Sequence, residues 1–219
     1  MLNKNIVAHR GFWKNIEEKN SLRALERALD HGFGVETDIR DFNGSLVLSH
    51  DLPNSSNCLE IKDFLNLYSK HSNSSGLIAL NVKSDGLGQL IKKIFGSYNF
   101  FERNVVMFDM SVPETFFYKN ISLPFLVRLS EYETLNSLEN YAEGYWVDNF
   151  GKNCTQVNIS KKLLKKNKKV VFVSPELHNL QHENIWNEIR AKKLHLDSNF
   201  FICTDFPLEA LSFFENKND

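Results

Sequence analysis

The stretch that decides the fold is Ile6-Val7-Ala8-His9-Arg10-Gly11, an apolar strand that ends in three residues of a different kind. An open, doubly wound nucleotide-binding sheet would place a glycine-rich turn after its first strand, and His9-Arg10-Gly11 is not such a turn. The rest of the chain repeats one unit, a short apolar strand followed by an amphipathic helical stretch. The first turn therefore favours a closed barrel over an open sheet.

Eight segments have the length and composition of strands, and helical patterns lie between them. The predicted strands are Ile6–His9, Gly34–Ile39, Leu77–Lys83, Asn104–Asp109, Phe125–Leu129, Gly144–Asp148, Lys169–Ser174 and Phe200–Asp205. The predicted helices are Ser21–His31, Glu60–His71, Leu87–Tyr98, Pro113–Tyr118, Thr134–Tyr141, Ser160–Asn167, Asn184–Lys193 and Pro207–Asn216. Strands separated by helices run parallel through right-handed crossovers, so eight units predict an α/β chain folded as a (β/α)8 barrel of the TIM type. Ser45–His50 is expected to add a hairpin strand after the Asn43-Gly44 turn.

The bulk composition is that of an ordinary globular protein. The chain has 219 residues, of which 24% are charged, and its net charge is −1. We expect a single domain over residues 1–219, and we expect no nucleic-acid partner because there is no excess of positive charge. The basic run at residues 161–169 contains a leucine pair and is typical of a helix with a solvated face.

The cysteines and the apolar segments indicate the cellular compartment in which the protein is expected. Cys58, Cys154 and Cys203 are odd in number and widely spaced, which argues against a disulfide framework or a zinc site. No segment offers the roughly 18 apolar residues of a membrane span, and no signal core precedes the first strand. These features predict a cytoplasmic protein without a membrane span, and they leave its oligomeric state open.

Two carboxylates share one face of the second predicted strand. Glu36 and Asp38 are two residues apart, so both side chains leave the same side of the strand. Two carboxylates in one space repel each other unless a cation lies between them, and Mg²⁺ or Ca²⁺ prefers such oxygen ligands. The alternative is a structural ion pair with Arg23 or Arg40.

Two histidines stand where neighbouring strands are expected to end. His9 closes the first strand, and His50, followed by Asp51, closes the hairpin. Imidazoles exchange protons near neutral pH, so a pair on opposite sides of a diester can act as general acid and base. Arg10 can bind phosphate oxygens through its guanidinium fork, and Lys83 ends the next strand. Together these residues indicate cleavage of a phosphodiester.

In the order of these motifs the chain resembles the glycerophosphodiester phosphodiesterases. The resemblance rests on His9-Arg10-Gly11, Glu36-x-Asp38, His50-Asp51 and a strand ending in Lys83, and it extends through Trp146-Val147-Asp148 to Thr204-Asp205-Phe206-Pro207. It implies a phospholipase-C-like barrel that hydrolyses a small phosphodiester with a divalent cation, Mg²⁺ or Ca²⁺, with Mn²⁺ as a further candidate. It also implies roles for individual residues: His9 and His50 in acid–base catalysis, Glu36 and Asp38 on the metal, and Arg10 and Lys83 on the phosphate.

The sequence departs from the pattern of that family at two places. The family usually has Glu-Asn-Thr where Lys19-Asn20-Ser21 stands, and Glu-Ile-Lys where Asn81-Val82-Lys83 stands. Asn81 still shares a face with Lys83, so its amide oxygen is the expected third metal ligand. Replacing a carboxylate by an amide weakens attraction for the ion but also avoids desolvating a charge. We expect a weaker metal site that remains lined with oxygen.

Later strand ends supply further candidates, because barrel enzymes carry substrate groups there. Arg128 is expected to bind a second anionic group of the substrate, or else to pair with Glu131 or Glu133. Trp146 is expected to pack against the leaving group, or else to fill the end of the barrel. Asp51 and Asp148 are expected to support the histidines or lysines of the site.

Two other functions remain open from sequence. The first is a weakly active or non-catalytic phosphoester-binding protein on the same barrel, which Asn81 suggests. The second is an aldolase or isomerase in which Lys83 forms a Schiff base with a carbonyl substrate.

Overall fold

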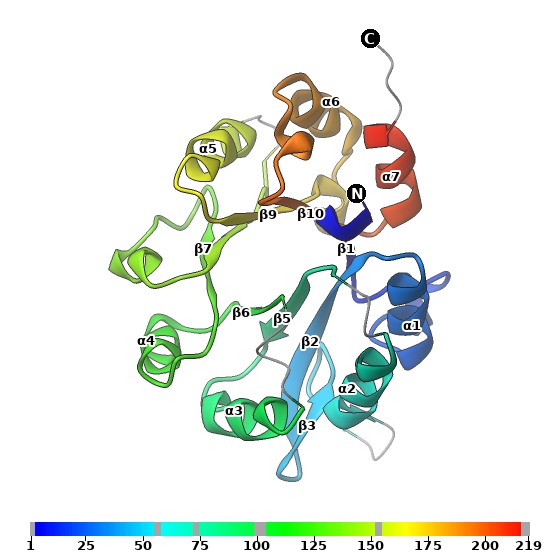
Figure 1. Cartoon of the computed structure of the whole chain (residues 1–219), viewed down its shortest axis with the longest axis vertical. Coiled ribbons are helices and arrows are strands. Elements are labelled where there is room, and N and C mark those ends of the chain that lie inside the picture. Colours follow the sequence, from blue (N-terminus) through cyan, green and yellow to red (C-terminus); the bar gives the residue numbers. More distant parts are fainter. Residues whose placement is uncertain (1–2, 55–57, 72–74, 99–103, 152–154, 216–219) are drawn as a thin grey trace.

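A ring of parallel strands surrounded by helices forms the body of the molecule (Figure 1). It was obtained as a computed structural model, which describes residues 3–54, 58–71, 75–98, 104–151 and 155–215. The ring contains β1 (Ile6–His9), β2 (Gly34–Phe42), β5 (Ile78–Val82), β6 (Val105–Phe108), β7 (Leu126–Leu129), β8 (Gly144–Val147), β9 (Lys169–Val173) and β10 (Phe200–Thr204). The eight predicted strands are therefore confirmed.

The ring closes on itself. β1 pairs with β2 on one side and with β10 on the other, and the order continues as β2-β5-β6 and β10-β9-β8-β7. The last gap is closed by a parallel bridge between Met107 and Phe125, beside which the Met107 N–H donates to the Pro124 carbonyl at 3.0 Å. The barrel expected from the sequence is thus the observed fold.

Seven α-helices of the described chain surround the ring (Figure 1). They are α1 (Leu22–Asp30), α2 (Ile61–Lys70), α3 (Gly88–Gly96), α4 (Val112–Asn120), α5 (Thr155–Leu164), α6 (Glu183–Ala191) and α7 (Pro207–Glu215). Short 3-10 turns add η1 (Asn3–Asn5), η2 (Ile16–Glu18), η4 (Ser137–Asn140), η5 (Pro175–His178) and η6 (Leu194–Leu196). Ser21 caps α1, because its hydroxyl accepts the Ala24 N–H at 3.2 Å.

Two predicted helices differ from the structure. Instead of a helix over Thr134–Tyr141 there is only η4, because the Asn136 side chain accepts the Leu138 N–H at 2.9 Å and forms a local turn. The helix expected at Ser160–Asn167 is α5, which begins five residues earlier, at Thr155, and ends at Leu164. Asn167, with a φ of 55°, reverses the chain after that helix. Cys154 and Asn216 lie outside the described residues.

A hairpin extends β2 beyond the ring. β2 continues to Phe42, turns at Asn43-Gly44 and returns as β3 (Ser45–Leu48), which pairs antiparallel with β2 and with β4 (Leu59–Glu60). This confirms the hairpin predicted after the Asn43-Gly44 turn. Its return strand delivers His50 to the carboxyl end of the barrel, which we call the mouth.

Apolar residues form two cores separated by the strands. The larger core lies between the strands and the helices and includes Val35 and Ile39 of β2. The smaller core fills the ring from inside and contains Val7, Leu77, Ala79, Val106, Phe108, Leu126, Trp146, Val171, Val173, Phe201 and Cys203. Because side chains alternate along a strand, residues at even spacing from these inner positions also face inward. The inward positions nearest the mouth carry most of the polar side chains of the barrel interior, together with the apolar Phe108, Trp146 and Val173.

The turn after β1 depends on Gly11, which packs directly against α1. Gly11 has a φ of +85°, and a Cβ there would lie 2.7 Å from the Ala24 carbonyl carbon, whereas Gly44, with a φ of +78°, has open space around it. We expect Gly44→Ala to lower the free energy of unfolding by about 1–2 kcal/mol through backbone strain alone. Gly11→Ala should lower the free energy of unfolding by at least about twice as much, since the steric clash with Ala24 adds to the backbone strain. Urea unfolding of both variants measures the difference; equal costs would contradict the close packing.

No helix within the described parts of the chain is both long and apolar enough to cross a membrane.

Candidate active site

The predicted site residues meet at the mouth of the barrel because neighbouring strands hold them in register. His9 on β1 lies beside Glu36 on β2, and Asp38 on β2 lies beside Asn81 on β5. A cavity of about 280 Å³ opens between them. Its lining consists of His9, Arg10, Glu36, His50, Asn81, Lys83, Phe108, Asp109, Arg128, Trp146, Asp148, Phe150, Val173, Leu177 and His178. Nine of the eleven predicted site residues therefore line one cavity, and the other two, Asp38 and Asp51, contact members of it.

His9 is held by a carboxylate from the last strand of the barrel. Its Nδ1 lies 2.6 Å from Asp205 Oδ1, and its Nε2 lies 3.9 Å from Glu36 Oε2. Because an ionised carboxylate only accepts hydrogen bonds, this contact places the proton on Nδ1 and leaves Nε2 for the cavity. Burial lowers the pKa of His9 below its usual range, although the hydrogen bond to Asp205 opposes this. His9 is thus suited to accept a proton through Nε2.

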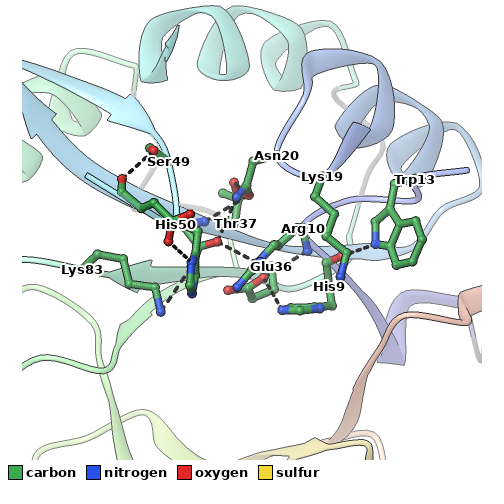
Figure 2. Close-up of polar contacts among 12 residues, drawn as sticks. His9, Arg10, Trp13, Lys19, Asn20, Glu36, Thr37, Ser49, His50 and Lys83 are labelled. Carbon is green, nitrogen blue, oxygen red and sulfur yellow. Dashed lines mark hydrogen bonds and ion pairs between the residues drawn. The ribbon is translucent and has the colours of Figure 1, made fainter. Parts of the chain in front are cut away.

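Arg10 takes part in the site through both its backbone and its side chain (Figure 2). Its backbone N–H donates to Glu36 Oε2 at 3.0 Å, with Arg10 in the left-handed region at a φ of 56°. Its Nε lies 2.9 Å from Asp38 Oδ2. Arg10 therefore neutralises the Asp38 carboxylate through its side chain and fixes the position of the Glu36 carboxylate through its backbone N–H.

Asp38 is fully buried and sits at the centre of the polar network. Oδ2 accepts from the Asn20 side-chain amide at 2.8 Å, and Oδ1 lies 3.4 Å from Lys83 Nζ. Asn20 Oδ1, the oxygen of the same side-chain amide, in turn accepts from the Thr37 hydroxyl at 2.8 Å and from the Asp38 backbone N–H at 3.3 Å. Asn20 thereby fixes the orientation of Asp38, a role that no motif in the sequence indicated.

Burial raises the pKa of Glu36, and the nearby charge of Asp38 adds to the effect, so that its value reaches about 8. The raised pKa favours the protonated form of Glu36 near neutral pH. The neighbouring cations Arg10 and Lys83 oppose this shift without cancelling it. A divalent cation at this position would displace the proton.

Two buried oxygens on adjacent strands accept no hydrogen bond from the described residues, although one of them lies 3.4 Å from Lys83 Nζ in an ion pair. They are Asp38 Oδ1 and Asn81 Oδ1. Buried oxygens normally have a partner, and paired strand positions place these two side by side. Together with Glu36 they form an oxygen set that suits a hard divalent cation. Within the described residues, no three His, Cys, Asp or Glu side chains are grouped to hold a metal ion. Asn81, beside Asp38, would contribute an amide oxygen instead of a carboxylate.

A chain of ion pairs crosses the cavity from Asp38 to Arg128. Lys83 Nζ lies 3.4 Å from Asp38 Oδ1 and 3.5 Å from Asp109 Oδ2, and the Arg128 guanidinium donates to Asp109. Arg128 Nε also lies 2.9 Å from Glu133 Oε2 and 2.8 Å from Asp148 Oδ2. Arg128 is therefore paired with Glu133, as one sequence alternative proposed, and has little charge left for a second anionic group.

Aromatic side chains form one wall of the cavity. Trp146 is buried and stacks on Phe108 with ring centroids 3.6 Å apart. Phe150 packs against His178 at 4.3 Å, and Glu131 accepts the Phe150 N–H at 3.2 Å. Trp146 thus lines the cavity and also fills the end of the barrel, so both roles expected from sequence are compatible with its position.

His50 enters the cavity from the hairpin rather than from a barrel strand (Figure 2). Its Nδ1 lies 2.8 Å from Asp51 Oδ1, and the Arg40 Nε–H donates to its carbonyl oxygen at 3.0 Å. The side chain is 44% exposed, compared with 14% for His9. The two histidines therefore differ in environment, with His9 enclosed and His50 open to solvent.

Lys19 and Trp13 complete the surroundings of His9. Lys19 Nζ lies 3.4 Å from Asp205 Oδ2 and 4.5 Å from the centroid of the Trp13 ring, whose Nε1–H donates to the His9 carbonyl at 3.1 Å. Burial opposes ionisation of Asp205, but its contacts with His9 and Lys19 hold its pKa below the usual range. Two signals in the sequence pointed to this arrangement, the departure from the family pattern at Lys19 and the position of Asp205 at the end of the last predicted strand.

Comparison with known proteins gives matches in structure. No family model matches the chain, and no curated protein matches its sequence. A glycerophosphodiester phosphodiesterase from Parabacteroides distasonis ATCC 8503 is similar with a TM-score of 0.73 and 18% identity over 99% of both chains. One from Agrobacterium tumefaciens str. C58 has a TM-score of 0.67 and 13% identity over 96% of this chain and 98% of that chain.

A third similar structure contains a product. It is a phosphodiesterase from Oleispira antarctica in complex with the product sn-glycerol-3-phosphate, with a TM-score of 0.64 and 16% identity over 97% of both chains. At these identities the likeness concerns the fold. This chain therefore has the barrel fold of the glycerophosphodiester phosphodiesterases.

Proposed function

We propose that this protein hydrolyses a small phosphodiester, of the glycerophosphodiester class, in a metal-dependent reaction. The observation that carries the proposal is that His9 and His50 line one cavity together with the buried oxygens of Glu36 and Asn81, with Asp38 behind them. Paired imidazoles beside a carboxylate–amide oxygen set suit acid–base cleavage of a diester. The product named in the Oleispira antarctica structure supports the same substrate class.

The metal would be held by Glu36, Asp38 and Asn81, and Mg²⁺, Ca²⁺ and Mn²⁺ are the candidate ions. When bound, a divalent cation supplies charge that polarises the phosphoryl oxygens. Arg10 and Lys83 lie on either side of Asp38 and line the cavity, so they are placed to bind the remaining phosphate oxygens. Their positive charges would also stabilise the oxygen that develops negative charge as the ester bond breaks.

The histidines would divide the proton transfers according to their environments. His9 presents an unprotonated Nε2 to the cavity, so it would remove the proton from the nucleophile, which is water or a hydroxyl of the substrate. His50, on the open side, would protonate the departing alcohol. Asp205 and Asp51 would orient the two rings through their Nδ1 atoms.

The direct test is hydrolysis of glycerophosphodiesters and bis(4-nitrophenyl) phosphate with Mg²⁺, Mn²⁺ or Ca²⁺, and with EDTA as the metal-free control. Turnover that requires the ion is the expected result. Phosphorus NMR at early times identifies the nucleophile, because attack by a substrate hydroxyl releases a cyclic phosphate. A folded protein that cleaves no diester with any of these ions would refute the proposal.

Asn81 favours a second candidate, a phosphoester-binding protein that cleaves slowly or not at all. Asn81→Asp would add a charge at the same volume, and we expect it to tighten Mg²⁺ binding by roughly 10- to 100-fold, net of the cost of desolvating the new charge. Calorimetric titration with Mg²⁺ measures this, and turnover is measured in parallel. If turnover rises together with Mg²⁺ affinity, Asn81 marks a site that has lost activity. If turnover falls while Mg²⁺ affinity rises, the amide of Asn81 suits this protein's own reaction. Unchanged Mg²⁺ affinity would contradict the placement of the metal.

A cytoplasmic location forms part of the proposal. The cysteines that the structure describes, Cys58 and Cys203, are free thiols, which suits a reducing compartment.

A further inference from the structure

Arg128 is surrounded by more negative charge than it carries. Asp109, Glu133 and Asp148 all pair with its guanidinium, and the last two lie 2.9 Å and 2.8 Å from Nε. One positive and three negative charges leave this group, the Arg128 cluster, with a net charge of −2. Lys83 reduces that excess only in part, because it is shared between Asp109 and Asp38.

The Arg128 cluster occupies one side of the cavity. Asp109, Arg128 and Asp148 line it next to Trp146 and Phe150, whereas the proposed phosphate-binding residues Arg10 and Lys83 reach it from the ends of β1 and β5. Glu133 reaches Arg128 from an adjoining cavity of about 250 Å³, which Asp109 and Arg128 also line. A diester whose phosphate lies near Arg10 and Lys83 would therefore place one of its alcohol groups beside the Arg128 cluster. The charge of that group then decides whether the contact is attractive.

Glu133 is the member of the cluster that the barrel does not require. Its side chain is 46% exposed, and its other contact is a 3.4 Å hydrogen bond from the Ser130 hydroxyl. Asp109 and Asp148 already neutralise Arg128, and Asp148 is buried. Without the Glu133 charge, one carboxylate fewer would compete with an anion for Arg128.

We propose that Glu133 is a specificity-determining residue, which makes this protein select phosphodiesters of uncharged or cationic alcohols and reject those with a second anionic group. The inference rests on the proposed phosphodiesterase function and defines its substrate class more closely. The physical reason is that an added anion meets the net negative charge of the Arg128 cluster, to which Glu133 contributes one of three carboxylates. The aromatic wall of Trp146 and Phe150 suits the carbon skeleton of such an alcohol.

Two small ligands test the charge selection directly. Glycerol 3-phosphate and 3-phosphoglycerate share a three-carbon phosphate, and 3-phosphoglycerate carries a carboxylate in place of the terminal hydroxymethyl group. We expect the wild-type protein to bind glycerol 3-phosphate at least about tenfold more tightly than 3-phosphoglycerate, as measured by calorimetric titration at a fixed Mg²⁺ concentration. Glu133→Gln should reduce this preference by roughly tenfold, the effect of one charge ~6 Å away in an effective dielectric of ~40.

Glu143→Gln is the matched control. Glu143 has similar exposure, pairs with Lys169 at 3.1 Å and precedes β8 at the opposite end of the barrel. The substitution Glu143→Gln changes the net charge by the same amount as Glu133→Gln. The preference of this variant for glycerol 3-phosphate over 3-phosphoglycerate should therefore equal that of the wild type. An equal effect in both variants would indicate long-range electrostatics and would overturn the assignment to Glu133.

The outcomes separate this inference from the function on which it rests. Phosphate binding without any preference in the wild type, or with a preference that Glu133→Gln leaves unchanged, overturns the charge selection and leaves the proposed hydrolysis standing. A preference that responds to Glu133→Gln, in a protein that cleaves no diester, supports the selection and refutes the hydrolysis. If neither ligand binds to any variant, the phosphate site is wrong and both proposals fall.

Discussion

Replacing His9 with glutamine should reduce kcat for diester hydrolysis by roughly 10²- to 10⁴-fold, the usual contribution of one general acid or base. Glutamine retains a polar side chain beside Asp205 but offers no group that takes up a proton at neutral pH. The loss should appear in kcat more than in KM, because the phosphate is expected to be bound by Arg10 and Lys83. His50→Gln should cause a loss of similar size at the other proton transfer.

The matched control is His71→Gln. His71 lies at the opposite end of the barrel, where its Nε2 is 3.0 Å from Asp30 Oδ1. Steady-state kinetics on a glycerophosphodiester, with circular dichroism to confirm folding, compare the three variants. If His9→Gln kept more than about a tenth of the wild-type kcat, His9 would have no role in proton transfer.

Replacing Asp38 with asparagine should reduce both metal affinity and turnover, each by roughly 10²- to 10³-fold. Gross attraction between a divalent cation and a carboxylate ~4 Å away is large at an effective dielectric of ~20, and part of it is offset by desolvation. Asp38 also holds Arg10 at 2.9 Å and Lys83 at 3.4 Å, so the variant leaves two cations facing each other. The loss should therefore exceed the simple loss of one metal ligand.

Stability should change less than activity in this variant. Lys83 keeps Asp109 as a partner, and the Arg10 side chain is 20% exposed and can be hydrated. We expect the free energy of unfolding to fall by about 1–3 kcal/mol, below the 3–5 kcal/mol of a buried pair broken without compensation. Asp30→Asn, at the opposite end of the barrel, controls for the change in charge. Mg²⁺ titration and urea unfolding measure the two effects, and a metal affinity within threefold of the wild type would contradict the proposed ligand set.

The strands of the barrel follow from short-range patterns in the chain. Each strand is a buried apolar run, and the alternation of its side chains assigned Glu36 with Asp38, and Asn81 with Lys83, to common faces. Helix boundaries were predicted less well at Thr134–Tyr141 and Ser160–Asn167. There, local side-chain hydrogen bonds and a left-handed residue end or replace the helix. Such competition depends on single residues that periodicity does not reveal.

Contacts within the site depended on residues that come together from distant parts of the chain. Asp205 reaches His9 across 196 positions, and Lys19 reaches Asp205 across 186. Asn20 orients Asp38 through a loop whose conformation requires left-handed backbone at Asn20 itself. No spacing rule in the sequence predicts these pairs, because closure of the ring brings β10 beside β1.

By itself the sequence determined the (β/α)8 barrel and the residues that face its mouth, since both depend on periodicity within single strands. Only the tertiary structure decided how those residues are paired. It enclosed His9 between Asp205 and Glu36, left one oxygen each of Asp38 and Asn81 without a hydrogen bond among the described residues, and gave Arg128 three carboxylates. The physical reason is that charge and burial at the mouth are sums over all eight strands and their loops, and each strand contributes only one or two of the groups.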